Sequence, residues 1–201
     1  MSRKQPGTGV TPHEDESRRA DARRNRARVL EAAEEVFAAK GTSASTGEIA
    51  RAAGVGIGTV FRHFPTKEAL LEAMYMARMQ RLTDDAEAGA AAADPGAAFF
   101  AFFERMIEQS ATKKAFSDAL TLAGVDVQSL IAPVARNLHK AIGALLARAQ
   151  KAGAVRSDVR VGEVIALLKG ASHAAEYAGR DRALQARTLA VIFDGLRPRR
   201  P

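Results

Sequence analysis

The chain contains no cysteine and no tryptophan, and aromatic residues make up only 5% of it. Without cysteine the protein forms neither disulfides nor thiolate zinc sites. Its four histidines show no pair at metal-ligand spacing, so neither a metal nor another cofactor is expected. No apolar run approaches the roughly 20 residues that span a bilayer, and the polar first residues lack the apolar segment of a secretion signal. We therefore expect a cytoplasmic protein with no membrane contact.

Alanine is abundant in the 201 residues, whereas β-branched side chains are sparse. This composition favours helix over strand. Hydrophobic residues make up 47% of the chain, which is typical of a folded protein and not of a disordered one. At this length roughly 70% of the unfolded surface can be buried, enough for one large domain or two small ones.

The formal net charge is +7, which favours an anionic partner, nucleic acid first. The positive charge is locally dense in residues 18–28, which contain six arginines and one aspartate. Two interpretations of this stretch stay open. It is either a solvated helix face or an arm that contacts DNA phosphates.

The spacing of apolar residues predicts an all-α fold in two parts. We expect a disordered tail at 1–20, a three-helix helix-turn-helix DNA-binding domain at 21–70, a larger helical ligand-binding and dimerisation domain at 71–196, and a basic tail at 197–201. Thr66 and Asp94 are predicted to cap the helices that follow them, the second with Pro95 at its first position and a connecting loop at 89–96 before it. The other helices are expected at 23–40, 46–53, 57–64, 113–122, 127–131, 134–152, 161–179 and 183–196.

Two of these helices are short and are joined by a tight turn. Ser45 and Glu48 form a capping box at the start of the first, in which the hydroxyl accepts from a free N–H and the carboxylate accepts from the cap backbone. Gly54 removes the steric cost of the turn. Helices joined this closely cross steeply, as in a helix-turn-helix, whose second helix enters the major groove.

The exposed side of the second short helix is small and polar, which lets a backbone approach DNA. Arg62 is expected to bind guanine or phosphate, with a solvated side chain as the alternative, and Ser45 is expected first of all to cap its helix. Lys67 is expected to hold a phosphate at a helix start. The predicted DNA-binding residues are Ser45, Thr46, Gly56, Ile57, Gly58, Thr59, Phe61, Arg62, His63 and Lys67.

Four groups of residues follow one another in this part of the chain: Ala32–Phe37 with Gly41, Ile49-Ala50 with Ala53-Gly54-Val55, Gly58–Phe64, and Lys67–Leu71. With these groups, residues 24–71 resemble the N-terminal domain of the TetR family of bacterial regulators. The resemblance implies a dimer that binds a palindromic operator and is released from it by a ligand. The family usually has tyrosine where this chain has Phe61, and the tyrosine hydroxyl contacts phosphate. Phe61 lacks that hydroxyl, and we expect it to pack on a sugar or a thymine methyl group.

The second part must hold any sensor site, and the resemblance does not supply its small-molecule effector. Four phenylalanines lie within residues 99–103 and cannot share one stripe, so this helix is expected to be buried on more than one side. Either it lines a cavity with polar groups from other helices, or the cluster is ordinary core. The ligand-binding candidates are Phe99, Phe103, Met106, Phe116, Leu120, His139, His173 and Tyr177.

For the dimer, the resemblance implies pairing of two long helices, here residues 134–152 and 161–179, across a two-fold axis. Both are rich in alanine, which permits close approach. The interface candidates are Leu138, Ile142, Leu145, Ala149, Ile165, Leu168 and Ala171.

Two other classes of protein fit the sequence less well. An enzyme is suggested only by Gly54, Gly56 and Gly58, which resemble part of a dinucleotide fingerprint but follow an expected helix and not a strand, so no enzyme is predicted. A helical scaffold that binds only protein leaves the small polar face unexplained. Within the DNA-binding class, repression is favoured and activation stays open.

Overall fold

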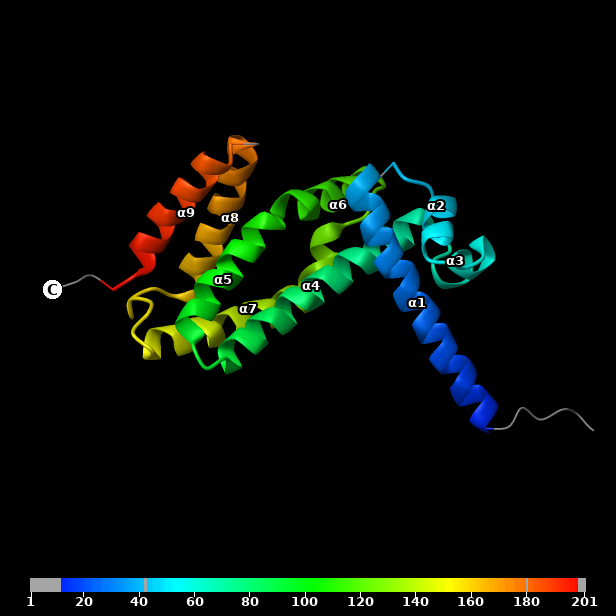
Figure 1. Ribbon diagram of the computed structural model, residues 1–201, viewed down its shortest axis with the longest axis horizontal. Helices are drawn as coiled ribbons and strands as arrows, with labels where there is room; N and C mark the ends of the chain where they lie inside the picture. The colour runs from blue at the N-terminus through cyan, green and yellow to red at the C-terminus, as the bar shows by residue number, and fades with distance from the viewer. Residues whose placement is uncertain (1–11, 42, 180, 199–201) are drawn as a thin grey trace, which may run out of the picture. The chain divides into compact units, whose positions relative to one another are not determined.

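The computed structural model describes residues 12–41, 43–179 and 181–198, without the side chains of residues 12–15 and 111–113. These residues form helices and connections, and no strand occurs among them. None of the helices in these ranges has the length and apolar character needed to cross a membrane. The helices, drawn in Figure 1, are α1 Pro12–Lys40, α2 Thr46–Ala52, α3 Ile57–His63, α4 Lys67–Ala91, α5 Pro95–Glu108, α6 Ser110–Leu122, α7 Val127–Lys151, α8 Val161–Ala178 and α9 Arg182–Leu196.

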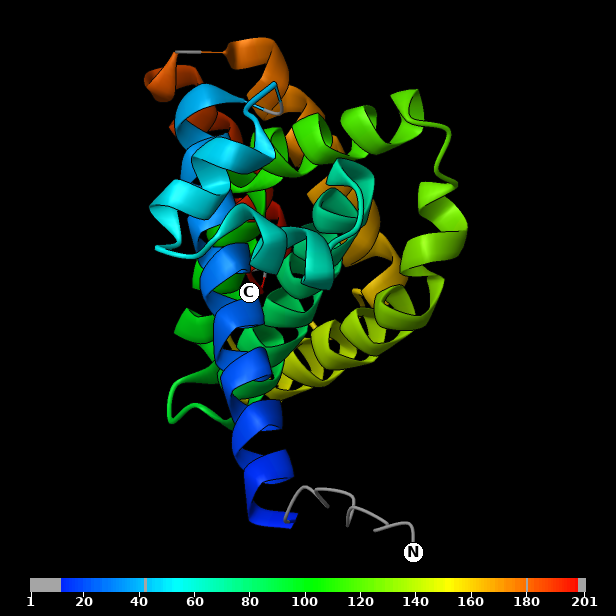
Figure 2. The same cartoon turned by 90° about the vertical axis from the view of Figure 1, so that its right-hand side faces the viewer.

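The chain divides into two compact units after Leu70, the residue at which the DNA-binding domain is expected to end. In the first unit α2 and α3 pack against the C-terminal part of α1, as Figure 2 shows. The core of this unit consists of apolar residues with at most 4% of their surface exposed, among them Val29, Ala33, Phe37, Ile49, Val60 and Phe64. The all-helical, helix-turn-helix prediction is confirmed for this unit.

The expected disordered tail at 1–20 is wrong for its second half. Helix α1 begins at Pro12 and not at residue 23, while residues 1–11 lie outside the described residues. Proline is favoured at the first helical position, and Pro12 occupies it here. Polar composition therefore marks an exposed helix here. Polarity alone does not separate such a helix from a disordered segment.

In the second unit α5 packs against α7 and α8, and α8 and α9 lie side by side in Figure 1. The start of α5 follows the prediction, because Asp94 Oδ1 accepts from the Ala97 amide at 2.9 Å and Pro95 stands at the first turn. The expected loop at 89–96 is shorter, since α4 continues to Ala91. The core includes Phe99, Phe103, Leu120, Leu145 and Val164, each at most 1% exposed.

The expected break before residue 134 is also absent. Residues 127–131 and 134–151 belong to one helix, α7, with Pro133 inside it and Ala152 as its C-cap. Asp126 caps this helix by accepting from the amides of Gln128 and Ser129 at 3.1 and 3.2 Å. A proline removes one helical hydrogen bond, and here the cap and the buried stripe further along α7 outweigh that loss. At the chain end, Arg197 and Pro198 follow α9, and residues 199–201 of the expected basic tail lie outside the described residues.

Candidate DNA-binding surface and ligand pocket

The start of α2 is held by the capping box that the sequence predicts. Ser45 Oγ accepts from the Glu48 amide at 3.3 Å, and Glu48 Oε2 accepts from the Ser45 amide at 2.9 Å. Lys40 Nζ lies 2.6 Å from Glu48 Oε1. The hydrogen bond from Lys40, with those from the Ser45 backbone and hydroxyl, lowers the pKa of Glu48 from 4.5 to about 2. The carboxylate thereby joins the end of α1 to the start of α2.

Two features fix the turn between α2 and α3, the backbone conformation of Gly54 and hydrogen bonds from Arg28. Gly54 has φ +62, a left-handed conformation in which a side chain is strained. The Arg28 guanidinium donates to the Ala53 carbonyl at 2.6 Å and to the Gly54 carbonyl at 3.4 Å. Arg28 thus satisfies carbonyls at the end of α2. Arg28 belongs to the basic stretch at residues 18–28, whose composition does not predict this contact.

Helix α3 has one buried side and one open side. Val60 is fully buried and the adjoining Phe64 is 2% exposed, whereas Ile57 and Phe61 are 45% and 46% exposed. Gly58 and Arg62 are also exposed, and Thr59 and His63 are half-buried. Of the predicted DNA-binding residues of α3, Ile57, Gly58, Phe61 and Arg62 therefore turn away from the core, together with Gly56 before the helix. Thr59 and His63 lie nearer to the core. Burying large apolar side chains is favourable, so an open face with Ile57 and Phe61 points to a partner.

Two glycines on this side are not required by the fold. Gly56 has φ −67, an ordinary value, and Gly58 lies in regular helix. A Cβ added to either residue would meet nothing within 4 Å. Local packing gives no reason for glycine here, in contrast to Gly54. Because neither residue has a side chain, a large partner can approach the backbone of α3 closely on this side.

The remaining predicted contacts flank α3. Thr66 accepts from the Ala69 amide at 3.1 Å and so caps α4, as expected. Lys67 Nζ lies 5.9 Å from the centre of the Phe37 ring. Ser45 is exposed and Thr46 is half-buried at the start of α2, where the Ser45 hydroxyl is already engaged in capping. The contacts of all these residues with DNA stay predictions.

The arginines of α1 do not all play one role. Arg26 lies over the Phe64 ring, 5.1 Å from its centre, and Arg24 pairs with Asp21. Arg28 holds the turn, while Arg18 and Arg23 are exposed on α1. The two interpretations of this stretch thus each apply to part of it. Some of its guanidiniums serve the unit itself, and others face solvent.

The predicted ligand residues do not come together around a pocket. Phe99, Phe103, Phe116 and Leu120 are at most 4% exposed and belong to the core, and Met106 is half-buried. The expected polar groups are exposed instead, namely His139, His173 and Tyr177, the last at 89%. Their helices turn them outward, so they face no cavity shared with the phenylalanines.

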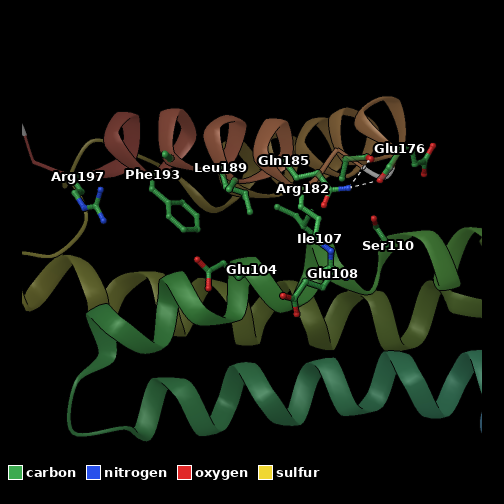
Figure 3. Close-up of a pocket in the computed structure, with 14 residues that line it drawn as sticks. Glu104, Ile107, Glu108, Ser110, Glu176, Arg182, Gln185, Leu189, Phe193 and Arg197 are labelled. Atoms are coloured by element: carbon green, nitrogen blue, oxygen red, sulfur yellow. Dashed lines mark hydrogen bonds between the residues drawn. The ribbon is translucent and has the colours of Figure 1, made fainter.

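The second unit holds a different pocket, of about 790 Å³, between α5 on one side and α8 and α9 on the other (Figure 3). None of the eight ligand candidates lines it. We call it the α5–α9 pocket. Its principal lining residues are Glu104, Ile107 and Glu108 from α5 and Arg182, Leu189 and Phe193 from α9. The periodicity of α9 indicated an apolar side but not the element that this side would face.

The predicted dimer residues are covered by their own chain. Six of them are 7% exposed or less, and Ile165 is half-buried. A side chain that is already buried contributes no surface to a partner, so the assignment of Leu138, Ile142, Leu145, Ala149, Leu168 and Ala171 to the interface is corrected. The large exposed apolar side chains of α8 and α9 are Leu167, Tyr177, Leu184 and Val191.

The glycines that suggested a nucleotide site have another setting. Gly54, Gly56 and Gly58 follow helix α2, and no strand precedes them in the described ranges. Gly54 serves the turn and the other two lie on the open side of α3. The arrangement lacks the strand that a dinucleotide fingerprint requires.

Comparisons with known proteins agree with this geometry. Residues 29–74 match the family of bacterial regulatory proteins of the tetR type, and residues 94–198 match the C-terminal domain of SbtR-like transcriptional regulators. Neither family is one of enzymes. Together the matches cover the helix-turn-helix and the helices that line the pocket.

Solved structures give the same result over nearly the whole chain. A TetR regulator from Mycobacterium vanbaalenii is 43% identical, with 90% of this chain and 99% of that one covered and a TM-score of 0.75. A TetR regulator from Streptomyces coelicolor is 36% identical, with 87% and 99% covered and a TM-score of 0.73. Dimers and response to ligands are typical of such proteins. On these grounds the chain belongs to the TetR family of DNA-binding transcriptional regulators.

Proposed function

We propose that this regulator is a repressor that binds a palindromic operator as a homodimer and leaves it when a small ligand binds. The observation that carries the proposal is the open side of α3. It combines Arg62, the exposed Ile57 and Phe61, and two glycines that the fold does not require. A surface of this kind fits the major groove, where base edges and thymine methyl groups are accessible.

The DNA contacts are proposed by chemistry. The Arg62 guanidinium donates to guanine or to phosphate, and Phe61 packs on a sugar or a thymine methyl group. Thr59 and His63, half-buried beside them, reach the groove edge. Lys67 at the start of α4 binds a phosphate. Exposed arginines of α1 add charge that any phosphate backbone attracts.

The dimer is proposed to form through α8 and α9. Two recognition helices must lie about 34–36 Å apart, or one helical turn, to reach successive major grooves, which a two-fold dimer provides. Four large apolar side chains, Leu167, Tyr177, Leu184 and Val191, are exposed on these two helices. A Cβ at Gly170 would meet nothing within 4 Å, so the α8 surface leaves room for close approach.

Release by ligand is proposed as a shift between two dimer states. A ligand that binds better when the recognition helices are misplaced lowers operator affinity by its differential affinity for the two states. The α5–α9 pocket is the candidate site for such a ligand, since its volume lies in the usual range for small molecules.

Operator binding is tested by fluorescence anisotropy with DNA from upstream of the protein's own coding region, at physiological salt. We expect Arg62→Ala to weaken binding by about tenfold or more, which corresponds to the loss of a base contact. Lys67→Ala should also reduce the slope of log K against log salt concentration by about 1. Arg136→Ala, which removes an exposed arginine of α7, is the matched control. Unchanged operator binding by both Arg62→Ala and Lys67→Ala would refute the assigned surface. Measuring transcription from the same promoter distinguishes repression from activation.

The dimer surface is tested by sedimentation. Val191→Arg places a charge on the exposed side of α9 and should produce monomers, because an unpaired charge is costly in an apolar interface. Leu122→Arg is the control, since Leu122 is 90% exposed on α6. A Val191→Arg variant that sediments as the wild-type dimer would contradict the assignment to α9.

A further inference from the structure

The α5–α9 pocket has one apolar end. The Phe193 ring lies against Phe100 and Phe103, with ring centroids 4.9 and 5.5 Å apart. From there the pocket runs along α9 towards Arg182, as Figure 3 shows. Its volume of about 790 Å³ suits an organic molecule with a sizeable apolar body.

Hydrogen bonds within the chain hold the wall opposite α5 in place. Gln185 Nε2 donates to the Ala175 carbonyl at 3.3 Å and to the Gly179 carbonyl at 2.9 Å. Asp181 Oδ1 accepts from the Leu184 amide at 2.9 Å and so fixes the start of α9. These bonds fix the corner between α8 and α9. A wall that is already ordered reduces the cost of ordering when a ligand binds.

Two carboxylates face this pocket from α5. Glu104 and Glu108 are one helical turn apart, exposed, and both line the pocket. Among the described residues neither forms a hydrogen bond or an ion pair. Like charges at this spacing destabilise a helix by about 0.2–0.5 kcal/mol. A cation bound between them would remove that repulsion.

The arginines that line the pocket do not balance its acidic groups. Arg197 Nη1 bonds Asp194 Oδ1 at 2.7 Å, and its guanidinium lies 5.1 Å from the centre of the Phe100 ring. Arg197 is therefore engaged at the apolar end. Arg182 supplies the other positive charge, against Glu104 and Glu108. Glu176, further along, has positive neighbours of its own, since its Oε2 lies 3.6 Å from His173 Nδ1 and it attracts Lys114. The pocket has an excess of negative charge beside an apolar surface.

We propose that the α5–α9 pocket binds an organic cation with an apolar body. The apolar body packs on Ile107, Leu189 and Phe193, and the positive charge lies between Glu104 and Glu108. This inference rests on the proposed function in one respect only, that the bound cation is the ligand that releases the operator. Binding itself does not depend on that function.

The test uses two probes of the same shape and opposite charge, tetraphenylphosphonium and tetraphenylborate, measured by isothermal titration calorimetry on the full chain. We expect the cation to bind at least about tenfold more tightly than the anion, because each carboxylate attracts one and repels the other. Glu104→Gln combined with Glu108→Gln should reduce cation affinity by about tenfold or more and leave the anion no weaker. Glu87→Gln, an exposed carboxylate of α4 outside the pocket, is the matched control.

Each outcome decides the proposal. Absence of cation binding, equal affinity for the two probes, or a double variant that binds the cation like the wild type would overturn it. Operator binding is followed in parallel by anisotropy. If the cation binds as expected but operator affinity does not change, the pocket assignment stands and the proposed release by this ligand fails. If the double variant binds operator normally and loses only the cation, both the surface and the pocket are supported.

Discussion

The two units build their candidate sites in different ways. In the first unit the open side of α3 is set by neighbours in the chain, the Ser45–Glu48 capping box, the Gly54 turn and the cap at Thr66. In the second unit the pocket joins α5 to α8 and α9, which are far apart in the sequence. A locally built surface depends on a few turn-forming residues, whereas a pocket built at long range depends on the packing that brings its walls together. A substitution in one unit should therefore change the local stability of that unit and leave that of the other unchanged.

The largest effect is expected when Phe193 is replaced, which should disrupt the α5–α9 pocket and leave the DNA-binding surface intact. Its ring packs on Phe100 and Phe103 and is 7% exposed. Phe193→Ala should lower the free energy of unfolding by about 3–5 kcal/mol, as buried phenylalanines do. Urea unfolding measures the loss, with Leu122→Ala at a 90% exposed position as the control. Hydrogen exchange should rise in α5 and α9 but not in α2 and α3, and equal loss of protection in both units would refute their independence.

A smaller and sharper contrast is expected between two glycines of the first unit. Gly54→Ala should lower stability by about 1–2 kcal/mol, because alanine is strained at φ +62. Gly58→Ala should leave stability unchanged or raise it by up to about 1 kcal/mol, since Gly58 is helical and its side is open. Gly58→Ala should nevertheless weaken operator binding by about tenfold, equivalent to about 1.4 kcal/mol, as its methyl group enters the contact surface. Thermal unfolding and anisotropy separate the two effects, and a Gly58→Ala protein that binds DNA normally would remove the argument from glycine.

The smallest effect is expected from the titration of Glu48, which belongs to the first unit. The folded pKa of Glu48, about 2, lies below its ordinary value of 4.5, so its stabilising contribution is complete above about pH 4.5 and is lost as pH falls towards 2. Stability between pH 5 and 3 should therefore fall less steeply in Glu48→Gln than in the wild type. Glu31→Gln, at an exposed position on α1, is the control. Equal slopes in all three proteins would show that the carboxylate does not couple α1 to α2.

The sequence predicts the elements whose cause lies within a few residues. The capping box at Ser45, the turn at Gly54, and the caps at Thr66 and Asp94 follow from the chemistry of short segments, and all are found. The role of Arg28 is not predictable in this way. Its guanidinium bonds a carbonyl 25 residues further along, which depends on how α1 packs on the turn.

The dimer assignment fails for a related physical reason. Leu138, Ile142, Leu145 and Ala149 form a regular apolar stripe on α7, and such a stripe predicts that a surface is buried. It does not say whether the same chain or a partner covers it. The α5–α9 pocket was missed likewise, because the pattern of α9 reveals an apolar side without naming the helix across from it.

Helix α9 has two occupied sides in the proposed dimer. Leu189 and Phe193 face the pocket, while Leu184 and Val191 point the other way, on a rod of only 15 residues. A ligand that displaces α9 in one protomer would therefore act directly on the partner protomer, without transmission through the core. Binding at the two sites of the dimer would then be cooperative, and a plot of occupancy against ligand concentration would depart from a simple hyperbola.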